Sequence, residues 1–426
     1  MRVLVVNMFV RGNRGDAALL SVALEQVRRA WPDAELAIAG FEHPAQWPTF
    51  DGVPNLGSIR RYAGEESAGR LARPARKLLA FGLGLLAALP RGGRLVRRLA
   101  GRLPAEMRAE VRALAAADLV LSVGGGYLNG RKDFASDLSI ALYALPLWLA
   151  QRFGVPVVLG PQSYGPFPTR LQALLIRHVV GRSRRVVARE GISVQRLAEV
   201  GVRAPLVVRG VDSAFAFRGT SDRPWRAELG VPADSRLVLV TARRSLTGAA
   251  QDRYEQAVTA AVRHLLDEGC HVVLVPQVTC AYLQDDDRLV NRRIAAALGG
   301  ADASPRLHVL DDDTLDHHEV FGLYRTADLI LGTRFHSVIF GLVSRVPCIA
   351  IEYDHKTSGI MADLDLSRWV VRTEDADPAT LVALVRRLVA EREEYRAHLE
   401  EVLPAYSARA EEFTALLRAE VAAAAR

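Results

Sequence analysis

The sequence has few cysteines, few lysines and no long apolar run, and each shortage argues against a class of protein. Its three cysteines, Cys270, Cys280 and Cys348, include no CxxC pair, which argues against a disulfide framework and against a zinc site. No run of about 18 apolar residues occurs, so no transmembrane helix is expected. The first residues, MRVLVVNMF, lack the apolar stretch and cleavage site of a signal peptide. These absences predict a cytoplasmic protein.

The residues that are present suffice for a large folded core. The chain has 426 residues, of which 50% are hydrophobic and 24% are charged. This composition excludes wholesale disorder, and the length predicts two or three domains.

Arginine supplies nearly all of the positive charge. The formal net charge is +7, and only Lys77, Lys132 and Lys356 are lysines among the 55 basic residues. A typical arginine therefore carries little functional information. Lys356 lies in a compact polar cluster, which makes it a candidate for a specific role.

The segment 60–112 concentrates this charge around an apolar stretch. It holds twelve arginines, one lysine and four glutamates, and residues 78–89 (LLAFGLGLLAAL) are apolar. As a helix, this stretch spans roughly 18 Å, which is shorter than the roughly 30 Å hydrocarbon core of a bilayer. Two interpretations stay open: a segment lying in the interface of an anionic membrane, and a buried helix pair with a solvated arginine rim. Nucleic-acid binding is disfavoured because aromatic residues are not interleaved with the basic ones.

Short β-branched runs alternate with helical stretches in both halves of the chain. In the first half the predicted strands are 2–7, 35–39, 119–123, 155–159, 185–188 and 206–208. In the second half they are 237–241, 271–276, 307–310, 329–331 and 347–351. The pattern predicts an α/β fold of two facing Rossmann-like domains, 1–218 and 219–400, with a helical stretch at 401–426. Ligands are expected in the cleft at the strand carboxyl ends.

Three motifs follow strands of the first half. Asn13-Arg14-Gly15-Asp16 predicts a tight turn with Asp16 as N-cap of a helix from Ala17, or a loop in which Asn13 holds a polar ligand. Gly124-Gly125-Gly126 allows close approach to a ligand, but its spacing fits neither GxGxxG nor a P-loop. The segment 160–166 (GPQSYGP) predicts a rigid polar loop around Gln162, with a structural turn as the equal alternative.

Two arginines stand at predicted strand ends. Arg189 offers an anion-binding fork, although pairing with Glu190 or another acid is favoured when it is considered alone. Residues 327–337 (ADLILGTRFHS) predict a strand and a helix start, where backbone amides and the helix dipole favour anions. There Arg334 offers a bidentate fork to carboxylate or phosphate, and His336 can transfer protons near neutral pH.

The remaining candidate residues of the second half are several acids and Lys356. His317, His318 and Glu319 with the acids 311–313 do not have the spacing of a recognised metal site, and Asp313-Thr314 is interpreted as a helix N-cap, so no metal site is predicted there. The run 285–287 is likewise interpreted as a cap of a helix start. Lys356, in the polar segment 352–357 after the next strand, suits phosphate as a point charge, with a surface loop as the alternative.

In their order and spacing these motifs resemble the polysaccharide pyruvyl transferase family. The resemblance runs from Asn13 to about Leu364, and the insertion 60–112 departs from it. The matching segments are 13–16, 124–128, 160–166, 188–190 with Ser193, Asp212 with 214–215, 275–277, 332–337, 346–347 and 353–356. The resemblance implies a glycosyltransferase-B-like fold and a role in bacterial exopolysaccharide and cell-envelope biosynthesis. It also implies transfer of the enolpyruvyl group of phosphoenolpyruvate to two hydroxyls of a sugar, which gives a pyruvate ketal and releases phosphate.

The resemblance also implies roles for individual residues. The expected donor-binding residues are Arg189, Arg334, His336, Ser337 and Lys356. The expected acceptor-binding residues are Asn13, Asp16, Gly125, Gly126 and Gln162. His336, beside Arg334, is the candidate general acid that protonates the donor methylene carbon. Phosphoenolpyruvate is a co-substrate, and no cofactor is required.

Two other interpretations stay open. The main rival is a glycosyltransferase of the same layout, in which Glu352 would bind the ribose of a nucleotide sugar and Arg334 with Lys356 its diphosphate. A non-catalytic sugar- or anion-binding protein is the third. If the acceptor is a lipid-linked saccharide, the insertion 60–112 would give peripheral contact with the inner face of the cell membrane.

Overall fold

The computed structural model describes residues 1–424 except 8–9, 65–71, 281–284, 301–303 and 355. By their internal contacts the residues divide into two compact units. The first unit comprises Met1–Val10, Leu19–Ser213 and Arg409–Arg426, and the second comprises Arg11–Ala18 and Ala214–Ala408.

These boundaries differ from the predicted domains in three places. Residues 11–18 belong to the second unit, because the buried guanidinium of Arg14 donates hydrogen bonds to Thr279 Oγ1 (2.8 Å) and to the carbonyl of Leu315 (3.1 Å). The predicted separate helix at 401–426 is the end of a longer helix, α16 (Arg392–Ala424), whose residues contribute to both units. The division between the halves falls after Ser213 rather than after 218.

The first unit is built on a parallel sheet with strand order β2-β1-β5-β7-β8-β9, and β6 pairs with β7. Its strands are β1 (Arg2–Val6), β2 (Glu35–Ala39), β5 (Leu119–Ser122), β6 (Gly125–Leu128), β7 (Val157–Tyr164), β8 (Arg185–Ala188) and β9 (Val207–Arg209). A short hairpin is formed by β3 (Thr49–Phe50) and β4 (Val53–Pro54). All four residues of β5 and all eight of β7 are buried, as expected of parallel strands covered on both faces.

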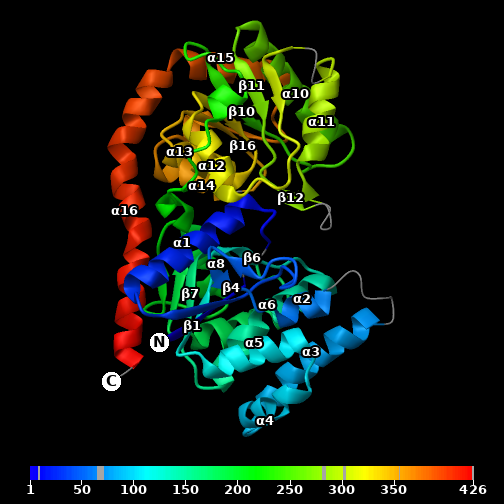
Figure 1. Cartoon of the computed structure of the whole chain (residues 1–426), viewed down its shortest axis with the longest axis vertical. Helices are drawn as coiled ribbons and strands as arrows, with labels where there is room; N and C mark the ends of the chain where they lie inside the picture. Colours follow the sequence, from blue (N-terminus) through cyan, green and yellow to red (C-terminus); the bar gives the residue numbers. More distant parts are fainter. Residues whose placement is uncertain (8–9, 65–71, 281–284, 301–303, 355, 425–426) are drawn as a thin grey trace. The chain divides into compact units, whose positions relative to one another are not determined.

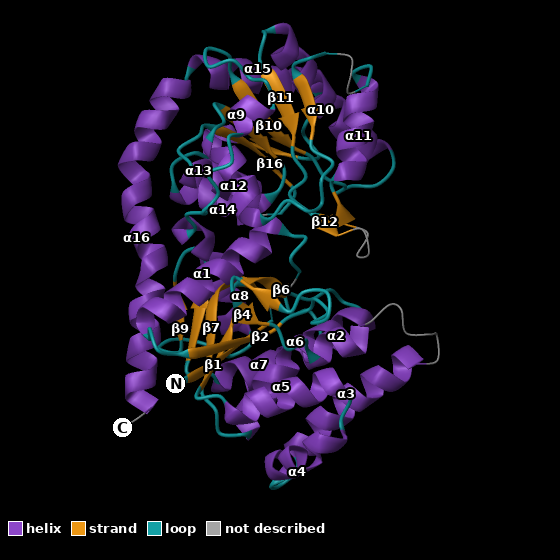
Figure 2. Ribbon diagram, viewed as in Figure 1, coloured by secondary structure: helices purple, strands orange, loops and turns teal. Residues whose placement is uncertain are grey.

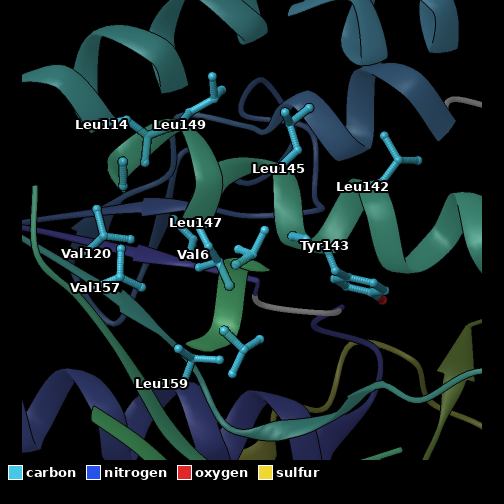
Figure 3. Packing of buried hydrophobic residues seen from close by; sticks show 14 of the residues in the cluster. Val6, Leu114, Val120, Leu142, Tyr143, Leu145, Leu147, Leu149, Val157 and Leu159 are labelled. Carbon is cyan, nitrogen blue, oxygen red and sulfur yellow. The ribbon is translucent and has the colours of Figure 1, made fainter. Parts of the chain in front are cut away.

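Helices cover this sheet and enclose its core (Figures 1 and 2). They are α1 (Arg14–Ala30), α2 (Ile59–Gly64), α3 (Ala72–Ala88), α4 (Gly92–Leu99), α5 (Ala105–Ala116), α6 (Phe134–Arg152), α7 (Arg170–Val179) and α8 (Gly191–Glu199). Figure 3 shows Leu147 of α6 beside Val6 of β1, and Leu149 of the same helix beside Leu114 of α5, all within one buried cluster that also includes Val120 and Val157. The first residues of α1, up to Ala18, belong to the second unit.

The second unit has a parallel sheet of strand order β14-β11-β10-β15-β16-β17. The strands are β10 (Leu237–Thr241), β11 (His271–Leu274), β14 (Leu307–Val309), β15 (Leu329–Gly332), β16 (Cys348–Glu352) and β17 (Val370–Arg372), with a separate hairpin of β12 (Thr279–Cys280) and β13 (Asp285–Asp286). Counted along the chain, this is the 3-2-1-4-5-6 order of a Rossmann sheet. The strand order therefore reverses between β10 and β15.

Helices also flank the second sheet (Figure 2). They are α9 (Trp225–Glu228), α10 (Ala249–Asp267), α11 (Arg288–Ala297), α12 (His317–Arg325), α13 (Phe335–Val343), α14 (Lys356–Asp363) and α15 (Pro378–Ala390). Among the described residues, no helix combines the length and apolarity needed to cross a bilayer.

Several local predictions are wrong. The segment 160–166 is not all loop, because β7 continues through Tyr164. The helix α1 begins at Arg14, and Asn13 rather than Asp16 caps it by accepting hydrogen bonds from the amides of Gly15 and Asp16. The cap of α12 is Asp316 rather than Asp313-Thr314, because its carboxylate accepts the amides of His318 and Glu319 in a capping box.

Candidate active site

The carboxyl edge of the second sheet gathers polar residues at the point where the strand order reverses. Thr241 ends β10, and its Oγ1 accepts the amide of Thr333 at 3.0 Å and lies 2.9 Å from Ser337 Oγ. The hydroxyl of Tyr254 lies 2.7 Å from Thr333 Oγ1. Burial raises the pKa of Tyr254 to about 12, so the phenol keeps its proton at neutral pH. These bonds fix the turn from β15 into α13. Open α/β sheets bind ligands at this edge.

His336 lies in the first turn of α13, against the backbone of residue 15. A Cβ atom placed on Gly15 would be 2.1 Å from His336 Nδ1 and 2.2 Å from its Cγ. No side chain other than hydrogen therefore fits at residue 15 while the imidazole keeps this position. The ring of Phe335 lies 5.1 Å from the ring of His336, edge to face. His336 as a whole is half-buried, although its Nε2 atom is buried.

The segment that carries Gly15 is held in place by its neighbours. Asn13 forms an isolated β-bridge with Val278, and its Nδ2 donates to Asp16 Oδ2 at 2.8 Å. Arg14 is buried, its amide donates to the carbonyl of Gln277, and burial lowers the pKa of its guanidinium. The predicted acceptor residues Asn13 and Asp16 thus lie in the same unit as His336 and bond each other.

Arg334 precedes α13, and acidic side chains hold its guanidinium. Its Nε donates to Asp287 at 3.0 Å, and its terminal nitrogens donate to both Asp285 and Asp287. Arg334 and Asp287 are buried, whereas the Asp285 side chain is 39% exposed. Burial disfavours the charge of Asp285, but the hydrogen bond from Arg334 and the positive charges of Arg334, Arg243 and Arg244 together outweigh it and hold the pKa of that carboxyl below its ordinary value.

The predicted cap at the run 285–287 is present only at Asp286, whose carboxylate accepts the amide of Arg288, the first residue of α11, at 3.0 Å, whereas Asp285 and Asp287 bind Arg334 instead. Asp287 precedes α11 but makes no capping bond. Its carboxylate instead accepts the amides of Gln277 (3.1 Å) and Val278 (2.9 Å) together with Arg334. Asp287 does not cap α11 because its carboxylate is bound by groups from elsewhere in the unit, namely from the loop after β11 and the loop after β15.

A second arginine shares Asp285 with Arg334. Arg243, after β10, places its terminal nitrogen 3.9 Å from Asp285 and stacks over the ring of Tyr353 at 4.1 Å. Its Nε is buried and has no hydrogen-bond partner within the described part of the chain. Arg244, the next residue, is exposed. Sequence analysis missed both, although two consecutive arginines directly after an apolar strand were the available signal.

The other residues of this unit that were predicted to bind the donor substrate differ in how deeply their side chains are buried. Ser337 is fully buried, and its hydroxyl donates to the carbonyl of Arg334, so it contributes to the turn. Lys356 opens α14, and its Nζ lies 3.1 Å from Asp354 Oδ2. The Lys356 side chain is 19% exposed, so its charge remains near the surface of this edge.

The first unit holds the remaining predicted residues at the carboxyl edge of its own sheet. Gly125 of β6 pairs with Gln162 of β7, and Gly126 follows in the same strand. Packing explains Gly124, because a Cβ there would lie 2.3 Å from the carbonyl oxygen of Pro161, and Gly125 adopts a positive φ of 147°. Gln162 is buried, and its Nε2 donates to the hydroxyl of Tyr164 at 2.8 Å.

A polar network beside these glycines escaped sequence analysis. Asn7 Nδ2 donates to Ser122 Oγ at 3.1 Å, and Ser122 Oγ lies 2.6 Å from the hydroxyl of Tyr127. Asn7 adopts φ 64°, in the left-handed region, directly after β1. A polar residue at the end of each apolar strand was the signal that could have identified this network.

Arg189 follows β8 and is buried among acids. It forms an ion pair with the buried Asp212, its Nε donates to Ser163 Oγ at 2.8 Å, and it lies 3.4 Å from Glu190. The expected pairing with an acid is therefore present. Ser193, in the next helix, donates to Glu190 and accepts the amide of Tyr164.

The fold defines the class of the protein. Two Rossmann-like α/β units characterise the glycosyltransferase-B-like proteins, and solved structures agree. A putative UDP-N-acetylglucosamine 2-epimerase from Listeria monocytogenes matches with a TM-score of 0.60 at 14% identity, over 96% of this chain and 94% of that one. Anabaena Alr3699/HepE, solved in complex with UDP-glucose, matches with a TM-score of 0.56 at 14% identity over all of both chains. The predicted fold class is confirmed.

Sequence comparison gives the family. The family model described as polysaccharide pyruvyl transferase matches residues 13–355, so the chain belongs to this family. It is 25% identical over 415 residues to the amylovoran biosynthesis protein AmsJ of Erwinia amylovora, covering 92% of this chain and 93% of that protein. The expected membership is therefore confirmed.

Proposed function

We propose that the chain transfers the enolpyruvyl group of phosphoenolpyruvate to two hydroxyls of one sugar in a polysaccharide precursor. The product is a cyclic pyruvate ketal, and phosphate leaves. Family membership and the similarity to a biosynthesis protein of a bacterial polysaccharide support this reaction class. The observation that carries it is a histidine held against Gly15 on a sheet edge that also presents Arg243, Arg334 and Lys356.

The donor is a trianion at most, and the cations of this edge match its charge. Its carboxylate would take the place of Asp285 between Arg243 and Arg334, since an exposed carboxylate already bridges these two guanidiniums. Lys356 and Arg244 would neutralise the phosphate. In the first unit, Arg189 and Gln162 with Gly125 and Gly126 are proposed donor and acceptor contacts on the strength of the family resemblance.

The chemistry needs a proton donor and then a proton acceptor. His336 would protonate the methylene carbon, the adjacent carbon would become an oxocarbenium-like centre, and a sugar hydroxyl would attack it. Breaking the bond from that carbon to the phosphate oxygen releases phosphate. The second hydroxyl then attacks and closes the ketal, and each hydroxyl gives up a proton: one would restore His336, and the other would leave with the phosphate. The charge on the departing phosphate is stabilised by the lysine and arginines.

A thermal-shift comparison tests the donor. Phosphoenolpyruvate should raise the melting temperature, whereas nucleoside diphosphates and nucleotide sugars should not. Stabilisation by a nucleotide alone would replace this proposal with a glycosyltransferase.

A histidine variant tests the proposed role of His336 as the general acid. His336→Ala should keep the phosphoenolpyruvate shift and lose release of phosphate in the presence of a saccharide acceptor, while the exposed His178→Ala should retain both. Near-normal turnover by His336→Ala would exclude the acid role.

A further inference from the structure

Helices α3 and α4 of the first unit leave leucines in solvent. Leu78, Leu85 and Leu89 are 71%, 72% and 53% exposed, and Leu95 on α4 is 40% exposed. Positions 78 and 85 fall within about 20° of each other around a helix axis, so they follow one face of α3, and Leu89 comes directly after its last residue. Isolated exposed leucines are ordinary, but an apolar stripe marks an interaction surface.

The other side of α3 is fixed to the unit, so the stripe is not a product of loose packing. Ala80, Leu83 and Ala87 are buried in the core. Trp148 Nε1 donates to the carbonyl of Gly84 at 3.2 Å, and Arg152 Nε donates to the carbonyl of Ala87 at 2.7 Å. In Figure 1 both helices lie at the edge of the first unit, outside α5 and α6.

The segment that carries the stripe is rich in positive charge and has no acidic residue. Residues 72–102 contain seven arginines and one lysine, and no aspartate or glutamate. Arg91, Arg94 and Arg98 are exposed, and they form no ion pair with any residue that the structure describes. In proteins with ordinary surfaces such cations are interspersed with acids.

The geometry points to a docking surface for an anionic lipid bilayer on α3 and α4. The leucines would enter the boundary between headgroups and acyl chains, and the arginines would contact lipid phosphates. The 17 residues of α3 span about 26 Å and carry three cations in the first two turns, so the helix lies along the interface rather than across it. This inference is independent of the proposed function.

Other occupants fit less well. A symmetric dimer through this surface would set its cations against the same cations of a second copy, because a two-fold interface joins identical patches. Single-stranded nucleic acid is bound through stacked aromatic rings, and the exposed apolar residues of α3 and α4 are leucines.

Cosedimentation of the full chain with vesicles tests the surface. The protein should pellet with phosphatidylcholine vesicles that contain phosphatidylglycerol, should not pellet with pure phosphatidylcholine, and should release as salt rises. The triple variant Arg91→Gln, Arg94→Gln, Arg98→Gln should bind on the order of 100-fold more weakly. A charge-matched control, Arg184→Gln, Arg253→Gln, Arg325→Gln, changes three exposed arginines elsewhere and should bind like the unmodified protein.

The contribution of the exposed leucines to vesicle binding is tested by a separate pair of variants. Leu78→Ser, Leu85→Ser should lose binding, whereas Leu171→Ser, Leu174→Ser should retain it, since these control leucines are 47% and 62% exposed on α7. Thermal unfolding checks that each variant folds. Absence of pelleting with anionic vesicles would overturn the proposal. Equal loss in the test and control variants would overturn it too, as would a self-association that the leucine substitutions abolish without changing lipid binding.

Discussion

The imidazole of His336 occupies the space that a side chain at residue 15 would need. Both residues belong to the second unit, although one is near the start of the chain and the other lies beyond its middle. A Cβ on Gly15 would overlap the ring, with its Nδ1 at only 2.1 Å. Gly15 and His336 therefore form one structural feature, in which the glycine leaves room for the imidazole.

Gly15→Ala should displace His336 and lower turnover by at least about tenfold, in line with the usual contribution of a general acid. Alanine is a better helix former than glycine by about 1 kcal/mol, so any destabilisation would come from the overlap rather than from the helix. Steady-state release of phosphate measures the effect. Gly82→Ala is the matched control, because nothing lies within 4 Å of a Cβ at that helical glycine. Normal turnover in Gly15→Ala would mean that the ring position is not needed.

Substitution of the two aspartates that bind Arg334 should lower the stability of the protein to different degrees. Asp287→Asn disrupts a buried ion pair and should lower the free energy of unfolding by about 3–5 kcal/mol. Asp285→Asn, at a partly exposed side chain, should cost under about 1 kcal/mol. Because Asp285 occupies the place proposed for the donor carboxylate, Asp285→Asn should also strengthen binding of phosphoenolpyruvate. Urea denaturation and donor titration measure the two effects, and weaker donor binding would count against that placement.

Arg189 and Asp212 should behave as a coupled pair. Arg189→Ala leaves Asp212 buried without its cation and should destabilise the protein by about 3–5 kcal/mol. The double variant Arg189→Ala, Asp212→Ala should cost less than the sum of the two single variants, since neither charge is then left alone. A double-mutant cycle from urea denaturation measures this coupling. Additive costs would show that the arginine is not tied to this acid.

Glu110 should make stability fall as pH rises. Burial raises the pKa of Glu110 to about 7, and the amide of Ile59, which donates to its carboxylate at 2.5 Å, opposes that shift only in part. The folded state thus holds a proton that the unfolded state loses near pH 4.5. The contribution of Glu110 to stability is therefore greatest below that pH, declines up to about pH 7 and then stays lower by about 3 kcal/mol.

Glu110→Gln should remove this decline, because the amide oxygen still accepts from Ile59 and carries no charge. Urea denaturation at pH 5 and pH 8 gives the comparison. The exposed Glu401→Gln should leave the dependence unchanged. An equal decline in Glu110→Gln and the unmodified chain would assign it to other groups.

The sequence predicts the sheets well because their strands are buried on both faces. Strands such as β8 and β10 begin and end at the predicted residues, since an apolar β-branched run is what a covered parallel strand requires. The short β17 was missed, because VVR within a mixed segment carries too little periodicity. Site motifs were found because strand carboxyl ends share one edge of a sheet.

The remaining features could not be predicted because they depend on contacts between residues far apart in the sequence. Arg334 was recognised as an anion fork, but the sequence does not show that Asp285 and Asp287 reach it from the β12–β13 hairpin and the start of α11. Asn13 and Asp16 both suit a helix cap, and only the backbone conformation decides between them. The placement of 11–18 in the second unit depends on a buried Arg14, in a chain where arginine is too common to be informative.

The first unit is completed by the last residues of the chain. Gln26 donates to the carbonyl of Ala410, Arg29 bonds Glu411, and Arg185 bonds Glu420, all within this unit. A ribosome makes these partners only after all of Ala214–Ala408, which at about 5–20 residues per second is a delay of roughly 10–40 s. During translation the nascent first unit therefore remains incomplete until the whole of the second unit and then the carboxyl half of α16 have been made.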